Sequence, residues 1–171
     1  MPGSPHHQPC TGATTGFVFI CPGRFEASRG YPCAAGTGAN LGRVLVELHV
    51  RRPDLFRSPT RSSYVITNSW DKVEYPALTG RSVPTEAEVL APESLARLQS
   101  EVDHLGVIVA CGAQAHAAVR VLAASGTLGA RVAYGRHLSQ RAVNMIPGGS
   151  DTATRIRLWC DAVLAQFPEP L

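Results

Sequence analysis

The 171-residue chain has few charged side chains and no long apolar run. Charged residues make up 17% of it and hydrophobic residues 44%, whereas disordered chains are rich in charge and poor in apolar residues. We therefore exclude an intrinsically disordered chain and expect one domain of ordinary size. A segment that spans a bilayer needs about 18 consecutive apolar residues, and no apolar segment of the chain is that long. We therefore expect no membrane partner.

The first residues also lack the basic stretch and apolar core of a secretion signal, so we expect a cytoplasmic protein. Lysine is nearly missing: of the 16 basic residues only Lys72 is lysine and the rest are arginine. Arginine makes planar, bidentate contacts with phosphates, which suits a polyanion partner. GC-rich coding explains the same bias, and the net charge is only +3.

The five cysteines form no Cys-x-x-Cys pair, and their number is odd. We therefore exclude a disulfide framework and a zinc ribbon, and expect most cysteines to be small buried residues. Residues 1–15 are rich in Pro, Gly, Ser and Thr and predict a flexible lead-in, in which His6 and His7 are disordered rather than metal ligands. The histidines on predicted helices have no clustered partners for a metal either: His49, His104 and His116.

Beyond this lead-in, short apolar runs alternate with helical patterns. Four runs predict buried strands at residues 16–21, 63–67, 106–111 and 130–134. Helical spacing of apolar residues predicts helices over 40–50, from 85 towards 105, over 112–124 and over 151–167. The second of these helices begins with a capping-box pattern, Thr85-Glu-Ala-Glu88.

Strands separated by helices imply right-handed crossovers and a parallel sheet covered on both faces. We predict a three-layer α/β/α sandwich around a four-stranded, mostly parallel sheet, with residues 16–171 as its single domain. Ligands of such folds bind at the carboxyl ends of the strands. Polar and turn-forming residues follow these ends and mark the predicted site: Cys21-Pro22-Gly23, Thr67 to Asp71, Gly112, and Gly135 to Ser139.

Two kinds of chemistry fit parts of this edge. The segment Gly36-Thr-Gly-Ala-Asn-Leu-Gly42 is a candidate phosphate-binding loop, but it follows no strand directly and lacks the Walker lysine. A flexible entry into a helix explains it better, although its amides could hold one DNA phosphate.

A cysteine hydrolase would use Cys21 or Cys33 as nucleophile and His137 as base. No nucleophile elbow surrounds either cysteine, which favours a buried structural role.

A third interpretation comes from four motifs in register. Residues 22–32, Pro-Gly-Arg-Phe-Glu-Ala-Ser-Arg-Gly-Tyr-Pro, resemble the first signature of the uracil-DNA glycosylase superfamily, nearest its bacterial family 4 and 5 branches. Residues 64–68, Tyr-Val-Ile-Thr-Asn, are similar to the strand whose terminal Asn reads the base. Residues 106–112 with the Ala-rich helix resemble the third strand, and His137-Leu-Ser139 resembles the closing His-Pro-Ser motif. The similarity runs from about residue 16 to residue 144.

The resemblance implies a monofunctional DNA glycosylase, which flips a pyrimidine out of DNA and hydrolyses its N-glycosidic bond to leave an abasic site. Asn68 would read the Watson–Crick edge of uracil or, with its amide turned, of cytosine. His137 would stabilise negative charge on O2 of the leaving base. Glu26 would orient water or stabilise the oxocarbenium sugar.

The resemblance also implies contacts to the base and to DNA. The base pocket would be lined by Cys21, Pro22, Gly23, Tyr31, Cys33 and Asn68. Phosphates flanking the base would be held by Arg24, Arg136, Ser139 and Arg141. Leu138 or Arg141 would fill the gap that the flipped nucleotide leaves. DNA is thus the expected partner, and we expect the chain to act as a monomer.

Three departures from the family pattern bear on the substrate. Ile20 and Cys21 stand where many relatives carry a water-activating residue, so Glu26 is the expected substitute. Cys33 stands where an aromatic ring would stack on uracil and exclude substituents at C5. The cysteine ligands of the family 4 iron–sulfur cluster are missing, so we expect no cofactor and no metal at the site.

These departures leave three functions open. One is repair of uracil or another deaminated base, with Tyr31 stacking on it. Another is excision of a bulky 5-modified cytosine, such as glucosylated hydroxymethylcytosine in phage defence, because Cys33 and the small residues after it would open the pocket wall. The third is a catalytically weak or inactive DNA-binding member. Asp71 either reaches the site or caps the loop after Asn68.

Overall fold

The structure, a computed structural model, describes residues 3–170. Four strands form one parallel sheet in the order β2-β1-β3-β4. They are β1 (Thr15–Phe19), β2 (Val65–Asn68), β3 (Val107–Cys111) and β4 (Arg131–Gly135). The predicted three-layer α/β/α fold is confirmed, with all pairs parallel, and each strand lies within two residues of its predicted start and end.

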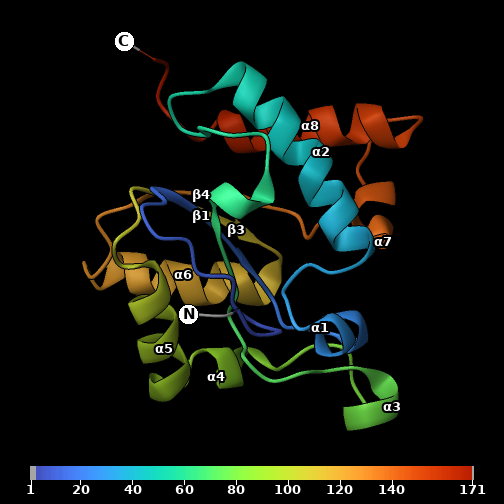
Figure 1. The fold of residues 1–171 in the computed structure, drawn as a ribbon, viewed down its shortest axis with the longest axis vertical. Coiled ribbons are helices and arrows are strands. Elements are labelled where there is room, and N and C mark those ends of the chain that lie inside the picture. Colours follow the sequence, from blue (N-terminus) through green and yellow to red (C-terminus); the bar gives the residue numbers. More distant parts are fainter. Residues whose placement is uncertain (1–2, 171) are drawn as a thin grey trace.

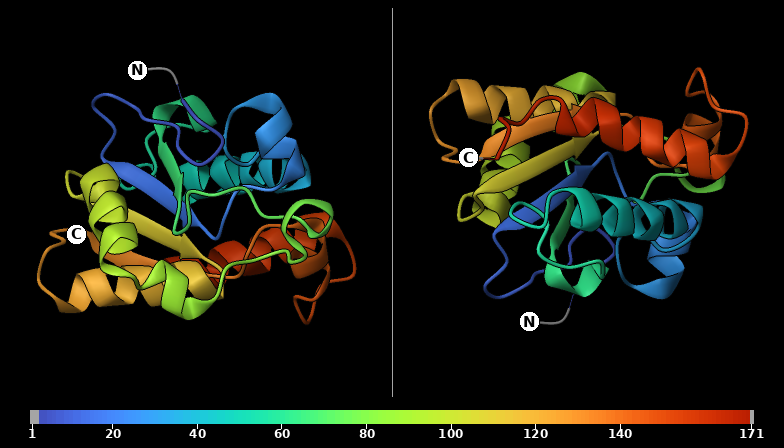
Figure 2. Two further views of the ribbon diagram at one scale, coloured as in Figure 1. Left: turned by 90° about the horizontal axis from the view of Figure 1, so that it is seen from below. Right: turned by 90° about the horizontal axis from the view of Figure 1, so that it is seen from above.

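The helices cover both faces of the sheet (Figure 1). Helices α2 (Gly36–Arg51) and α8 (Thr152–Leu164) lie on one face, and α5 (Pro92–Val102) and α6 (Ala113–Ala124) lie on the other (Figures 1 and 2). Shorter helices connect them: α1 (Arg24–Arg29), α3 (Pro76–Thr79), α4 (Glu86–Val89), α7 (Gln140–Asn144) and the 3-10 turn η1 (Arg61–Ser63).

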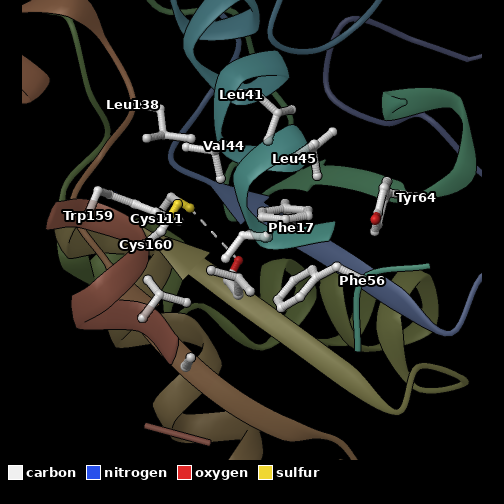
Figure 3. Packing of buried hydrophobic residues seen from close by; sticks show 14 of the residues in the cluster. Phe17, Leu41, Val44, Leu45, Phe56, Tyr64, Cys111, Leu138, Trp159 and Cys160 are labelled. Carbon is white, nitrogen blue, oxygen red and sulfur yellow. Dashed lines mark hydrogen bonds between the residues drawn. The ribbon is translucent and has the colours of Figure 1, made fainter. Parts of the chain in front are cut away.

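Alternation along the strands divides the core into two layers, because successive strand side chains point to opposite faces. Phe17 packs in the layer beneath α2 and α8, whereas Val18 packs in the layer beneath α5 and α6. Figure 3 shows the first layer. It contains Leu41, Val44 and Leu45 of α2, Phe17 of β1 and Trp159 of α8. Each helix thus buries its apolar side against one face of the sheet.

The helix predicted from residue 85 towards 105 is wrong as one element. Its capping box is present: Thr85 Oγ1 accepts from Glu88 N–H at 3.3 Å, and the Glu88 carboxylate accepts from Thr85 N–H at 2.7 Å. This helix, α4, ends at Val89, and α5 begins at Pro92. A proline has no N–H to donate and clashes with the preceding turn, so it ends one helix and starts the next.

The expected flexible lead-in is also corrected for residues 6–14, which pack onto the domain. Gln8 exchanges two backbone hydrogen bonds with Ile66, of 2.7 and 3.1 Å, and so forms an antiparallel bridge along the outer edge of β2. The Gln8 side chain donates to the carbonyls of Arg61 and Tyr64. The segment therefore covers an edge whose backbone groups would otherwise be unpaired. Within residues 3–170, no helix has both the length and the apolar character to cross a membrane.

Two glycine substitutions test this packing. Gly135 ends β4, and a Cβ there would lie 2.5 Å from Cζ2 of Trp159, so Gly135→Ala should destabilise the fold by about 1–3 kcal/mol. Gly42 lies on the exposed side of α2 with open space around it, so Gly42→Ala should stabilise by about 0.5–1 kcal/mol. Urea unfolding of both variants measures the difference. Equal midpoints would contradict the contact between Trp159 and β4.

Candidate active site

A cavity of about 180 Å³ lies at the carboxyl ends of β1 and β2. It is lined by Phe19, Cys21, Gly23, Glu26, Cys33, Thr37, Asn68 and His137. Apart from Phe19 and Thr37, these are residues that the sequence predicts for the site. The structure therefore brings together side chains from three of the four motifs, although up to 111 positions separate them in the chain.

Asn68 ends β2, where it pairs in register with Phe19 of β1. Its side chain is 2% exposed, and its Nδ2 donates to the His6 carbonyl at 3.0 Å. Because a carbonyl oxygen only accepts, Nδ2 and not Oδ1 must face His6, which fixes the orientation of the amide. Within residues 3–170, this is the one hydrogen bond of the Asn68 side chain, so Oδ1 is available to a ligand.

His137 follows β4 and packs edge-on against Phe19, with 5.7 Å between ring centroids. Its Nδ1 accepts from the Ser139 N–H at 3.0 Å, so the neutral ring carries its proton on Nε2. Burial lowers the pKa of His137, and the negative charge of Glu26 only partly opposes this effect. The ring is therefore a neutral Nε2–H donor near pH 7.

Glu26 lies in α1, and backbone amides hold both of its oxygens. Oε2 accepts from Gly23 N–H at 2.9 Å, and Oε1 accepts from Ala34 N–H at 3.0 Å. The carboxylate thus closes the loop from residue 23 to residue 34. An ionised carboxylate has about four acceptor positions, so Glu26 can still accept a hydrogen bond from water in the cavity.

Cys33 has a left-handed backbone conformation, with φ of 54°. Arg61 holds this turn by donating to the Cys33 carbonyl at 2.8 Å and to the Pro32 carbonyl. A Cβ at Gly38 would lie 2.1 Å from the same Cys33 oxygen, so only glycine fits there. Close packing against this turn explains Gly38, and no phosphate-binding role is needed.

The cavity thiols are poor nucleophiles. Burial raises the pKa of Cys21 to about 12 and raises that of Cys33 well above its ordinary value. The thiolate is the reactive form of cysteine, and neither residue reaches it near neutral pH. The raised pKa values of both thiols therefore disfavour a cysteine hydrolase.

Seven predicted site residues lie outside the cavity lining, among them Tyr31, Pro22 and Leu138. Tyr31 is 40% exposed with the Arg61 guanidinium 5.2 Å above its ring, so Phe19 is the aromatic side chain of the cavity. Pro22 is buried, and its carbonyl accepts from Glu74 N–H. Leu138 is fully buried in the layer beneath α2 (Figure 3). This burial disfavours its predicted role as a wedge in DNA, because insertion would require the core to open.

The other polar residues considered for the site differ in their exposure and in their partners. The predicted phosphate contacts Arg24, Arg136 and Arg141 are exposed. Ser139 is half-buried and caps α7 by accepting from Ala142 N–H. Asp71 lies outside the cavity lining, with its carboxylate 4.0 Å from Arg97.

No model of a known protein family and no curated protein matches the chain. Only the sequence motifs and the cavity where their residues meet therefore indicate a function.

His137 predicts a pH dependence of stability. Its folded pKa is lowered, so below the ordinary value of 6.5 the unfolded chain binds protons more readily than the folded one. Protonation would also remove the acceptor for Ser139 N–H. The contribution of His137 is thus present above pH 6.5 and lost on acidification. Urea unfolding at pH 7.5 and 5.5 should show a larger loss for the wild type than for His137→Gln. Equal losses would contradict a buried neutral ring.

Proposed function

We propose that the chain is a DNA glycosylase that binds one flipped pyrimidine in this cavity and hydrolyses its N-glycosidic bond. The observation that carries the proposal is the meeting of Asn68, His137 and Glu26 around a single cavity at the strand ends. Such an enzyme needs an amide to read the base, a donor for the leaving base and a negative group near the sugar. The three side chains supply these groups.

The orientation of the Asn68 amide favours uracil as the base. The cavity of about 180 Å³ has room for a pyrimidine ring. Oδ1 of Asn68 can accept from N3–H of uracil while Nδ2 remains on the His6 carbonyl. Uracil is therefore the substrate that we favour.

Bond cleavage places negative charge on the base and positive charge on the sugar. His137 donates from Nε2 to O2 of the departing base, and a neutral donor stays protonated as that charge develops. Thr37 lines the cavity and lies in the first turn of the 16-residue helix α2, so the partial positive charge at the amino end of α2 lies near the cavity.

Glu26 supplies fixed negative charge for the oxocarbenium sugar. The amides of Gly23 and Ala34 hold the carboxylate in place, which favours an electrostatic role and the orientation of water. Water adds its oxygen to C1′ of the sugar and loses a proton. The base leaves with the bonding electron pair and then takes up a proton.

DNA would bind over the exposed arginines around the cavity. Arg24, Arg136 and Arg141 are exposed and would contact phosphates, so binding should weaken as salt rises. Since Leu138 is buried, Arg141 remains the predicted residue for the gap in the duplex. We propose that the chain acts on DNA as a monomer in the cytoplasm.

Two other functions have one supporting observation each. Cys33 lines the cavity where a bulky ring would exclude 5-substituents, which favours a modified cytosine as substrate. Cys21 lines the cavity where many relatives carry a water-activating residue, which favours a catalytically weak or inactive DNA-binding protein.

Release of the base distinguishes these functions. Oligonucleotides with one uracil, hypoxanthine, hydroxymethylcytosine or glucosylated hydroxymethylcytosine are incubated with the chain, and abasic sites are cleaved with alkali. We expect strand breaks and free uracil, identified by mass. Cleavage of modified cytosine alone would support the second function. DNA binding without cleavage of any substrate would contradict the enzyme.

Single-turnover rates of variants test the roles of the side chains. His137→Ala should slow uracil release by about 10²–10³-fold, as loss of a donor to a developing oxyanion does, with DNA affinity nearly unchanged. Asn68→Ala should slow release of uracil and weaken discrimination between bases. His104→Ala is the matched control, because His104 is exposed and lies outside the cavity lining. An equal effect in the control would contradict the assignment.

Cys33→Phe tests the pocket wall. A larger ring at this position reduces the room next to the base, so the variant should lose any activity on 5-substituted pyrimidines before it loses activity on uracil. The ratio of the two rates is the measurement. An unchanged ratio would show that Cys33 does not face the base.

A further inference from the structure

A second cluster of chemically active side chains lies near Asn68, outside the lining of the candidate active site. The ligand atoms of His6, His7 and Glu101 all lie within 4.8 Å of one another. The histidines belong to the segment that runs along β2, whereas Glu101 lies near the end of α5. The proposed glycosylase mechanism uses none of these three side chains, and only the backbone carbonyl of His6 takes part in it, as the acceptor for Asn68.

The spacing of two of these atoms fits a shared metal ion. His6 Nε2 and Glu101 Oε1 are 3.1 Å apart. Zinc binds nitrogen and oxygen at about 2.0–2.2 Å in tetrahedral geometry, which separates two ligand atoms by about 3.3–3.6 Å. The pair therefore already has nearly the separation that one ion would give it, and only the His7 side chain must approach further.

Neighbouring groups orient both ligands in the way that outer-shell partners do. Ser4 Oγ lies 3.0 Å from His6 Nδ1, so it can accept from Nδ1–H when Nε2 binds a metal. The second carboxylate oxygen of Glu101 accepts from the Thr67 hydroxyl and from Arg97 at 2.8 Å. Thr67 and Arg97 thus hold Glu101 by Oε2 and leave Oε1 to His6 or to an ion.

The cluster is also accessible. His7 and Glu101 line a cavity of about 740 Å³, which gives an ion a path to the ligands and leaves room for water. His104 and Cys10 line the same cavity but do not belong to the group of three. They therefore provide controls within the same cavity.

From this geometry we propose that His6, His7 and Glu101 bind a divalent transition-metal ion of the zinc type, with water as the fourth ligand. Two histidines and one carboxylate are a ligand set that zinc accepts with one open position. The ion would join the N-terminal segment to α5 across the edge of β2. It would also hold the His6 carbonyl against Asn68, because Asn68 donates to that carbonyl.

To test this, bound metal is first removed from the full chain with a chelator. The chain is then titrated with Zn²⁺, and binding is measured by calorimetry or by competition with a coloured zinc indicator. We expect one ion per chain and a higher melting temperature with Zn²⁺. His7→Ala and Glu101→Gln should weaken binding by at least about 100-fold, and Ser4→Ala by about 10-fold, as expected for an outer-shell partner. His104→Ala and Cys10→Ser should bind as the wild type does.

Loss of binding in Glu101→Gln would show that the folded chain holds the ion, and not the two neighbouring histidines alone, because Glu101 lies 95 positions from His6 in the chain. Circular dichroism checks that this variant is folded, and His7→Ala provides a second variant if it is not. Absence of saturable binding, unchanged binding in folded Glu101→Gln or in His7→Ala, or an equal loss in His104→Ala would overturn the proposal. These readouts do not involve DNA, so they succeed or fail independently of the glycosylase.

Discussion

The candidate site depends on the register in which β1 pairs with β2. Phe19 and Asn68 are partners at the ends of these parallel strands, so both side chains leave the same face at the same edge. His137, which follows β4, closes the cavity against Phe19. A shift of one residue in β2 would turn Asn68 to the opposite face, towards α5, and separate it from the cavity.

Main-chain groups orient the three polar side chains on which the proposed function depends. The His6 carbonyl fixes the Asn68 amide, the Ser139 N–H fixes the tautomer of His137, and two amides fix the Glu26 carboxylate. Such groups need little reorganisation when a charged intermediate forms, which is the condition for electrostatic catalysis. The same dependence on His6 connects the proposed metal cluster to the cavity, because one backbone carbonyl belongs to both.

Sequence patterns predict those parts of this fold that depend on local information. Each buried strand is a short apolar run, and alternation of strands and helices is enough to predict the parallel sheet. The sequence also contains Pro92, and the break between α4 and α5 could have been predicted from it. Phe19 is part of a predicted strand, but only tertiary packing places its ring on the cavity wall. Contacts between distant positions, such as Asn68 with His6 or Leu138 with the core, leave no local pattern, and the burial of Leu138 disfavours its predicted role.

The central claim is that His137 offers a neutral Nε2–H to a pyrimidine bound beside Asn68. Nitrogen NMR of the histidines, with the His137 signal assigned by comparison with His137→Gln, tests this claim directly. The account predicts an unprotonated Nδ1 and a protonated Nε2 at pH 7.5, and a shift of the Nε2–H signal when uracil and abasic DNA are added together. A proton on Nδ1, or an Nε2–H signal that does not change while DNA binds, would contradict it.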